Sequence, residues 1–256
     1  IKIALAGNPN VGKSTLFNSL TVMHQHTGNW SGKTVATAKG EFESGRYRCE
    51  ITDLPGTYSL YAHSDEEKAA RDYICFCRSD KTLVVADGSS LERNLILAVG
   101  VCEAVDNVVL AVNLMDEAER NGVTINFDML SERIGVRVLA TAARSGRGID
   151  KLKKTLIDDK YCSKKLRIDY PKAETAISVV EQKIRRIGKA GDFSPRWLAI
   201  KFIENDLELV SEIASACDFT SDELLDIDNA LSKAADLLGK EGIASEKAGD
   251  YFSQCI

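Results

Sequence analysis

The chain has 256 residues, of which 44% are hydrophobic and 28% charged, a composition typical of a globular protein with a substantial core. The 33 Lys and Arg residues against 38 Asp and Glu residues give a net charge of −5, which disfavours a dedicated nucleic-acid-binding function. The longest apolar run, residues 95–102, is far too short for a membrane span, and we expect no secretory leader. Seven scattered cysteines indicate reduced thiols in a cytosolic compartment.

The first part of the chain, residues 1–162, alternates short β-rich apolar runs with segments of helical period. The expected strands are 2–6, 47–53, 82–86, 107–113 and 136–141, and the expected helices are 13–22, 66–77, 91–103, 127–134 and 149–158. This alternation predicts an α/β domain with a mostly parallel sheet covered on both faces. Sheets of this class bind ligands in the loops at the carboxyl ends of their strands.

The second part, residues 163–256, shows only helical periodicity after an extended piece, which predicts a small all-α domain. The expected helices cover 177–187, 197–203, 207–214 and 224–238. The stretch 164–189 has eight Lys and Arg residues against three acids; we favour a solvated face there, with the inner membrane surface or another subunit as alternatives. The stretch 202–232 has nine acids and no basic residue, and we favour a solvated face there too.

A phosphate-binding loop is predicted between the first strand and the first helix. The pattern G-x-x-x-x-G-K-[ST] is matched by Gly7, Asn8, Pro9, Asn10, Val11, Gly12, Lys13 and Ser14, which are followed by Thr15. The two glycines let successive N–H groups and the helix N-terminus point at a phosphate. Lys13 supplies a positive charge to the β- and γ-phosphate oxygens, and Ser14 offers its hydroxyl group to Mg²⁺.

A second motif, D-x-x-G, follows the next strand of the predicted sheet. Asp53 ends that strand, so its carboxylate is predicted to hold Mg²⁺ beside the phosphate loop, usually through water. The Gly56 N–H group is predicted to approach a γ-phosphate because glycine has no Cβ atom. Between the two motifs, the polar segment 27–38 lacks clear periodicity and contains Thr34, a candidate Mg²⁺ ligand that competes with Thr37.

Base selection is predicted at the end of the strand 107–113. The carboxylate of Asp116 can accept hydrogen bonds from N1–H and the exocyclic amine of guanine, a pair that adenine does not offer. Asn113 can brace the loop and the base. After the next strand, Thr141, Ala142 and Ala143 lie where a backbone N–H group meets guanine O6, although the Ser and Lys usual in that motif are absent.

Together these motifs resemble the Ras-like P-loop GTPases and, more narrowly, the cytosolic N-terminal region of the ferrous iron transport protein B family. The specific matches include Gly-Asn-Trp-x-Gly-x-Thr-Val at 28–35, Leu-Glu-Arg-Asn-Leu at 91–95 and Arg-Trp-Leu-Ala-Ile-Lys at 196–201, so the resemblance spans nearly the whole chain. It implies a G domain over 1–162 that binds GTP and GDP, and a helical domain over 163–256 similar to a nucleotide-dissociation inhibitor. In the family a membrane domain that carries Fe²⁺ follows.

The resemblance also has implications for catalysis and for partners. Thr57 stands where Ras-like enzymes carry a water-positioning Gln, which implies slow intrinsic hydrolysis. The resemblance implies that a K⁺ ion compensates for the missing Gln. This ion would be held by Asn10 and by backbone carbonyls near Gly28 and Trp30, at the position where an arginine finger would act. The implied partners are the guanine nucleotide, the transporter's own membrane domain at the cytoplasmic face of the bacterial inner membrane and, as an open alternative, a homo-oligomer.

Two other functions remain alternatives to a GTP-hydrolysing transporter module. One is a soluble bacterial GTPase in ribosome or tRNA maturation, which is disfavoured because residues 161–256 carry 13 basic and 17 acidic side chains rather than a basic surface. The other is a nucleotide-binding switch that signals to a protein partner with negligible turnover.

Overall fold

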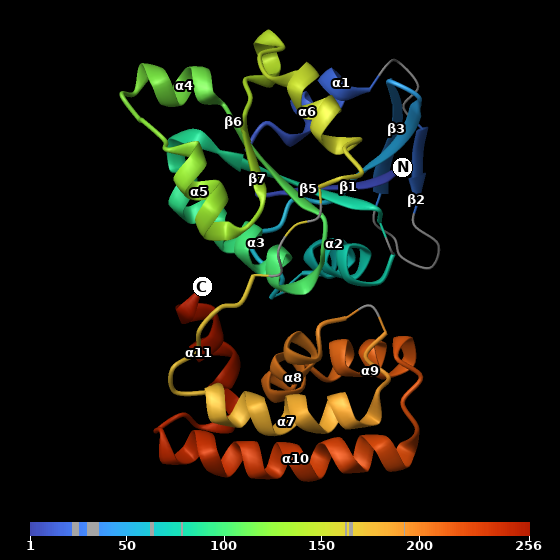
Figure 1. Cartoon of the computed structure of the whole chain (residues 1–256), viewed down its shortest axis with the longest axis vertical. Coiled ribbons are helices and arrows are strands. Elements are labelled where there is room, and N and C mark those ends of the chain that lie inside the picture. The colour runs from blue at the N-terminus through green and yellow to red at the C-terminus, as the bar shows by residue number, and fades with distance from the viewer. Residues whose placement is uncertain are drawn as a thin grey trace. The chain divides into compact units, whose positions relative to one another are not determined.

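A computed structural model shows two compact units, Ile1–Leu166 and Arg167–Ile256. It describes residues 1–21, 26–29, 36–61, 64–77, 79–161, 163, 166–191 and 193–256. Figure 1 shows a sheet with surrounding helices in the first unit and only helices in the second. Over these ranges, every helix is too short or too polar to traverse a lipid bilayer.

The first unit is built on a mostly parallel sheet. Its strands lie in the order β2-β3-β4-β1-β5-β6-β7, with β2 and β3 antiparallel to their neighbours and the others parallel. The strands are β1 (Lys2–Gly7), β2 (His26–Asn29), β3 (Ala36–Ser44), β4 (Tyr47–Asp53), β5 (Lys81–Asp87), β6 (Val108–Asn113) and β7 (Arg137–Ala140). The predicted fold class, a Ras-like α/β domain followed by a helical domain, is confirmed.

Helices cover both faces of this sheet, with α1 and α6 on one face and α2 and α3 on the other (Figure 1). The helices are α1 (Lys13–Leu20), α2 (Asp65–Phe76), α3 (Leu91–Ala104), α4 (Met115–Arg120), α5 (Phe127–Ile134) and α6 (Ile149–Leu156). Ile3 and Leu5 of β1 pack in one core cluster with residues of α1 and α6. All six residues of β6 are buried, as expected for a central strand covered on both sides. The carboxyl ends of β1, β4 and β6 therefore share one edge of a rigid sheet.

The second unit is a helical bundle in which several helix ends have well-formed caps. They are α7 (Glu174–Ile187), α8 (Pro195–Glu204), α9 (Leu207–Ala216), α10 (Ser221–Lys240) and α11 (Ala248–Cys255). Ser194 caps α8 with Pro195 in its first turn, and Thr220 forms a capping box with Glu223 at the start of α10. Gly188 ends α7 in the left-handed conformation, as the predicted turn requires.

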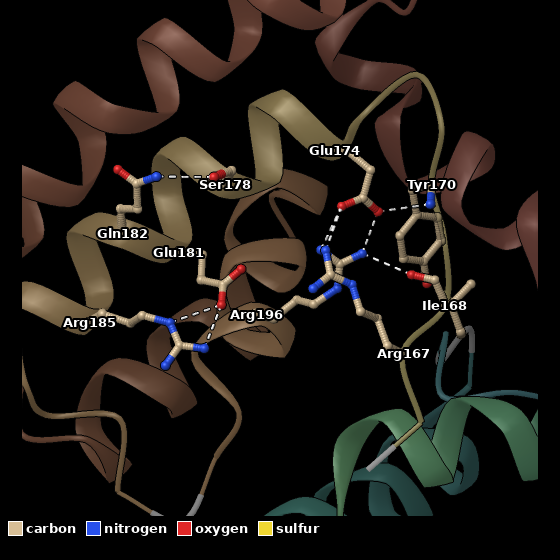
Figure 2. A network of polar contacts seen from close by, with 9 residues as sticks. All are labelled: Arg167, Ile168, Tyr170, Glu174, Ser178, Glu181, Gln182, Arg185 and Arg196. Atoms are coloured by element: carbon tan, nitrogen blue, oxygen red, sulfur yellow. Dashed lines mark hydrogen bonds and ion pairs between the residues drawn. The ribbon is translucent and has the colours of Figure 1, made fainter. Parts of the chain in front are cut away.

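A partly buried ion pair joins the first turn of α7 to α8, with further contacts from the segment before α7 (Figure 2). The Glu174 carboxylate accepts hydrogen bonds from Arg196 at 2.6 and 3.0 Å and from the Tyr170 backbone N–H at 3.0 Å, with Arg167 at 3.2 Å. Arg196 also donates to the Ile168 carbonyl at 2.8 Å. Burial by itself would raise the pKa of Glu174, but the hydrogen bonds from Arg196 and Tyr170 outweigh it and bring the pKa to about 2.

We expect Glu174→Gln to lower the free energy of unfolding by about 3 kcal/mol at neutral pH, because the buried Arg196 guanidinium group would lose the negative charge of Glu174. Since the folded-state pKa lies below the ordinary value of 4.5, this stabilisation is complete above that value and disappears as the pH falls towards 2. Urea unfolding of both chains at several pH values measures the difference.

The matched control for this prediction is Glu181→Gln in the same helix. Glu181 pairs with Arg185, whose side chain is 59% exposed, so its loss should cost only about 0.5 kcal/mol (Figure 2). Equal losses in the two variants would show that the Glu174–Arg196 pair makes no special contribution.

Candidate functional site

The predicted phosphate loop joins β1 to α1, and its backbone takes conformations that few residues tolerate. Asn10 and Gly12 have positive φ angles of 67° and 76°. A Cβ atom on Gly12 would lie 2.6 Å from Asn113 Nδ2, and one on Gly7 would lie 2.8 Å from the Val85 carbonyl oxygen. Close packing therefore requires both motif glycines, and the positive φ angle at Gly12 favours glycine there as well.

The N-terminus of α1 is open to an anion. Ser14 and Thr15 are exposed in its first turn, and that turn carries no acidic side chain. The first intrahelical hydrogen bond from this loop runs from the Leu16 N–H to the Gly12 carbonyl at 2.9 Å, so the preceding N–H groups are free of helical partners. These N–H groups and the helix dipole make the turn a ready phosphate site.

Lys13 and Asp53 form an ion pair across the strand ends. The Lys13 Nζ atom contacts Asp53 Oδ1 and the Leu54 carbonyl, and the two charged side chains are only 12% and 13% exposed. Asp53 pairs with Leu5 in the parallel register of β1 and β4, which brings it beside the phosphate loop. Burial raises the pKa of Asp53 and the Lys13 charge opposes that rise. The two residues predicted for phosphate and metal thus lie together.

The D-x-x-G segment is held against the phosphate loop by its backbone. Leu54 N–H donates to the Leu5 carbonyl at 3.0 Å and Thr57 N–H donates to the Gly7 carbonyl at 3.2 Å. Gly56 faces Pro9 so closely that a Cβ atom would lie 3.1 to 3.3 Å from three Pro9 atoms. The structure therefore places Gly56 next to the loop, as the sequence predicts.

Thr57 has a structural contact that sequence reasoning missed. Its side chain is fully buried, and its hydroxyl group donates to the Ser59 carbonyl at 2.6 Å, with the Glu67 carboxylate 3.5 Å away. Thr57 therefore does not present a polar group to solvent at the place where a Gln would position water. Nothing in the sequence around Thr57 indicates this hydrogen bond of its hydroxyl group.

Asn113 links the phosphate loop to the loop after β7. Its side chain is fully buried; Nδ2 donates to the Val11 carbonyl at 3.0 Å, and Oδ1 accepts from Ala143 N–H at 3.0 Å and from the Thr141 hydroxyl at 3.2 Å. These three bonds give Asn113 the loop-bracing part of its predicted role. They also place Val11, Asn113 and the 141–143 segment around one point.

Asp116 lies in the first turn of α4 with a 41% exposed side chain, so it is free to reach a base. Its nearest described cation is Arg120, 3.9 Å away. An ion pair of 2.8 Å between Glu119 of the same helix and Arg147 connects this helix to the loop after β7. Sequence reasoning missed this pair, because two exposed charges 28 residues apart carry no periodic signal.

The backbone N–H groups of Thr141, Ala142 and Ala143 already donate within the chain. Thr141 N–H donates to Val112, Ala142 N–H to Arg147 and Ala143 N–H to Asn113. A contact from this segment to guanine O6 would have to share or replace one of these bonds, and it stays a prediction.

For three of the predicted metal ligands, the structure gives no side-chain position. Thr34 and Trp30 lie outside the described residues. Gly28 lies in β2, where its backbone pairs with Thr37 of β3. Thr37, the alternative to Thr34, is buried. The predicted K⁺ cage and the threonine ligand of Mg²⁺ stay predictions.

Comparison with known proteins identifies both units. A family model described as "Ferrous iron transport protein B" matches residues 1–156, and one described as "FeoB cytosolic helical domain" matches residues 170–249. The cytosolic domain of the T. maritima FeoB iron transporter in a GDP form aligns with a TM-score of 0.77 at 33% identity, covering 94% of this chain and 96% of that one. A GDP-bound mutant of the S. thermophilus FeoB G-domain aligns with a TM-score of 0.81 at 32% identity, covering 99% and 97%.

Two curated relatives extend this likeness to whole transporters. A fusion of Fe(2+) transport protein A with the Fe(2+) transporter FeoB from Porphyromonas gingivalis is 38% identical over 252 residues, which are 92% of this chain and 30% of the relative. The Fe(2+) transporter FeoB of Escherichia coli is 35% identical over 222 residues, which are 81% and 27%. The chain thus spans less than a third of the length of these relatives. On the match to residues 1–156, the chain belongs to the ferrous iron transport protein B family.

Proposed function

We propose that this chain binds GTP and hydrolyses it to GDP and phosphate, as the cytosolic regulatory module of a ferrous iron transporter. One observation carries the proposal: the strand ends of β1, β4 and β6 bring Lys13, Asp53, Gly56 and Asn113 to one edge of the sheet, with Asp116 in the turn that follows β6. Phosphate, metal and base recognition each require one part of this set. Relatives of the same fold are described in GDP and GMPPNP forms.

Phosphate binding in this proposal begins with the opening of the Lys13–Asp53 ion pair. The N–H groups of the loop and of the first turn of α1 donate hydrogen bonds to the β-phosphate oxygens, and Lys13 turns from Asp53 to the β- and γ-phosphate oxygens. Gly56, packed on Pro9, then offers its backbone N–H to the γ-phosphate without a side chain in the way.

The residues that remain fit a magnesium ion. Asp53 and Ser14 supply a carboxylate and a hydroxyl oxygen, the hard ligands that Mg²⁺ prefers, and Thr34 is the proposed third ligand. When bound, Mg²⁺ would neutralise charge on the β- and γ-phosphates. Asp53 suits this role because its buried position beside Lys13 leaves it without a charge partner once the lysine turns to phosphate.

Asn10 is the side chain proposed to bind K⁺. It is exposed on the phosphate loop, and its left-handed backbone is one that asparagine tolerates better than most residues. The amide oxygen is a suitable ligand for a monovalent cation, with carbonyls near Gly28 and Trp30 completing the proposed set. The ion would supply the positive charge that an arginine finger supplies in related enzymes.

The proposed role in a transporter rests on membership of the family and on the greater length of the curated relatives. We propose that the module acts at the cytoplasmic face of the bacterial membrane, with the membrane domain of the same transporter as its partner and a homo-oligomer as a further assembly. The curated relatives are whole Fe(2+) transporters more than three times as long as the aligned region.

Guanine selectivity tests the proposed nucleotide. We expect the chain to bind GTP much more tightly than ATP, and Asp116→Asn to weaken GTP binding by roughly 100-fold while admitting xanthine nucleotides, because one acceptor facing guanine N1–H or its amine becomes a donor. Isothermal titration calorimetry with GTP, XTP and ATP measures each affinity.

Glu117→Gln is the matched control, since this exposed carboxylate is next in the same turn and is assigned no base contact. This variant should leave the affinities for GTP, XTP and ATP unchanged. ATP binding as tight as GTP binding by the parent chain would refute the proposed nucleotide.

A further inference from the structure

A groove of about 390 Å³ lies between α7 and α10 in the helical unit. Its polar lining consists of Gln182, Lys183 and Arg186 from α7 and Asp226, Asn229 and Lys233 from α10. Within each helix, most of these residues are three or four positions apart. Each set therefore lies along one side of its helix. The helices run antiparallel, as shown by the Lys183–Asp226 and Lys189–Glu223 ion pairs at 3.0 and 2.9 Å.

The groove is lined by more positively charged side chains than negatively charged ones. Asp226 pairs with Lys183, which leaves Arg186 and Lys233 without an ion-pair partner among the described residues. Neighbouring cations of the unit are paired: Arg185 with Glu181 and Lys189 with Glu223 (Figure 2 shows the first pair). Lys240, at the end of α10, also has no ion-pair partner among the described residues, but it does not line the groove. Arg186 and Lys233 are thus two unpaired cations that face one groove.

A second cavity in the same unit shows the opposite charge. This cavity of about 740 Å³ lies by α8 and α10, and its charged lining residues are Glu204, Asp228 and Glu246, with no Lys or Arg among the described lining residues. The surface of α10 is thus divided: the side facing α7 has the free Lys233, and the side facing α8 carries carboxylates.

We propose that the groove between α7 and α10 binds a phosphate group. Arg186 offers a planar guanidinium group and Lys233 a point charge from opposite walls, and the Asn229 amide adds a neutral donor. A phosphate between the walls would neutralise both cations at once, as a carboxylate does for the neighbouring Arg185 and Lys189. The phosphate belongs to a small soluble ester or to an anionic lipid headgroup. This site is separate from the nucleotide site and does not depend on the proposed GTPase function.

The test is an NMR titration of the ¹⁵N-labelled chain at low salt, followed at the backbone amides of α7 and α10. The probes are inorganic phosphate, glycerol 3-phosphate, and dihexanoyl phosphatidylglycerol below its micelle concentration, with dihexanoyl phosphatidylcholine as the zwitterionic comparison. Amide shifts in residues 8–15 report the phosphate loop separately, so failure of one site is distinguishable from failure of the other.

The variant Arg186→Gln/Lys233→Gln should weaken binding in the groove by roughly 10-fold or more, since each cation near a phosphate contributes substantially. Its control, Arg185→Gln/Lys240→Gln, makes the same change in net charge on the same two helices outside the groove lining and should leave the affinity unchanged.

Each outcome decides between the sources or against the site. Binding of phosphate and glycerol 3-phosphate as tight as that of phosphatidylglycerol supports a soluble ester. Binding of phosphatidylglycerol alone supports a lipid headgroup. No shift in α7 and α10 with any probe, equal binding of phosphatidylcholine, or equal losses in the variant and its control overturns the proposal.

Discussion

Lys13→Ala is expected to weaken GTP binding by about 100-fold. The lysine is the only described side-chain cation in contact with the D-x-x-G carboxylate at the phosphate loop, and its loss leaves several negative phosphate oxygens without a point charge. The substitution also leaves Asp53 buried without its countercharge, so the variant should melt at a lower temperature in the absence of nucleotide. Fluorescence titration with a labelled GTP analogue measures the affinity.

Lys151→Ala in α6 is the control for this variant. Lys151 is exposed, and its substitution removes the same charge at another place in the first unit. It should change neither affinity nor melting temperature by more than the error of measurement. A folded Lys13→Ala chain that binds GTP as tightly as the parent would place the phosphate site elsewhere.

GTP turnover is expected to be about 10-fold or more faster in KCl than in NaCl at matched ionic strength. No Gln follows the D-x-x-G glycine to position water, so we expect a cation beside the β- and γ-phosphates to add to the positive charge of Lys13 and Mg²⁺ in the transition state. Asn10→Ala should erase the potassium response and leave GDP affinity nearly unchanged, because the N–H groups of the loop stay in place. Single-turnover hydrolysis in the two salts measures the effect.

The backbone of Asn10 requires a second variant. With φ at 67°, alanine at this position adds strain of about 1 kcal/mol that has nothing to do with a cation, whereas Asn10→Gly removes the side chain without that strain. Both variants should lose the response. A potassium response that survives in Asn10→Gly but not in Asn10→Ala would assign the effect to loop geometry, and equal parent rates in both salts would remove the cation from the mechanism.

The sequence predicted the parts of the fold whose signals are local. Strands such as β6 are continuous apolar runs, and Gly188 and Pro195 mark helix ends, so these elements appear close to their predicted bounds. The same holds for the candidate site, because each predicted motif follows a strand and the parallel topology brings the strand ends together.

The sequence did not predict β2 and β3 at one edge of the sheet. Gly40 occupies a core-facing position of β3, where a Cβ atom would lie 2.5 Å from the Thr21 side chain, so the apolar alternation that marks a strand is missing there. Helices α4 and α11 were also not predicted, since neither short segment repeats its apolar residues at helical spacing over more than about two turns. Long-range polar contacts such as Arg196–Glu174 have no sequence periodicity at all.

The position of Asn113 affects how the free energy of nucleotide binding is divided between recognition of the base and recognition of the phosphates. One buried amide holds both the Val11 carbonyl of the phosphate loop and the Ala143 N–H of the loop after β7. Contributions from residues that share a partner do not add independently. Free energies measured for substitutions in the two loops should therefore be non-additive in a double-mutant cycle, so the recognition of base and of phosphate by this chain behaves as one thermodynamic unit.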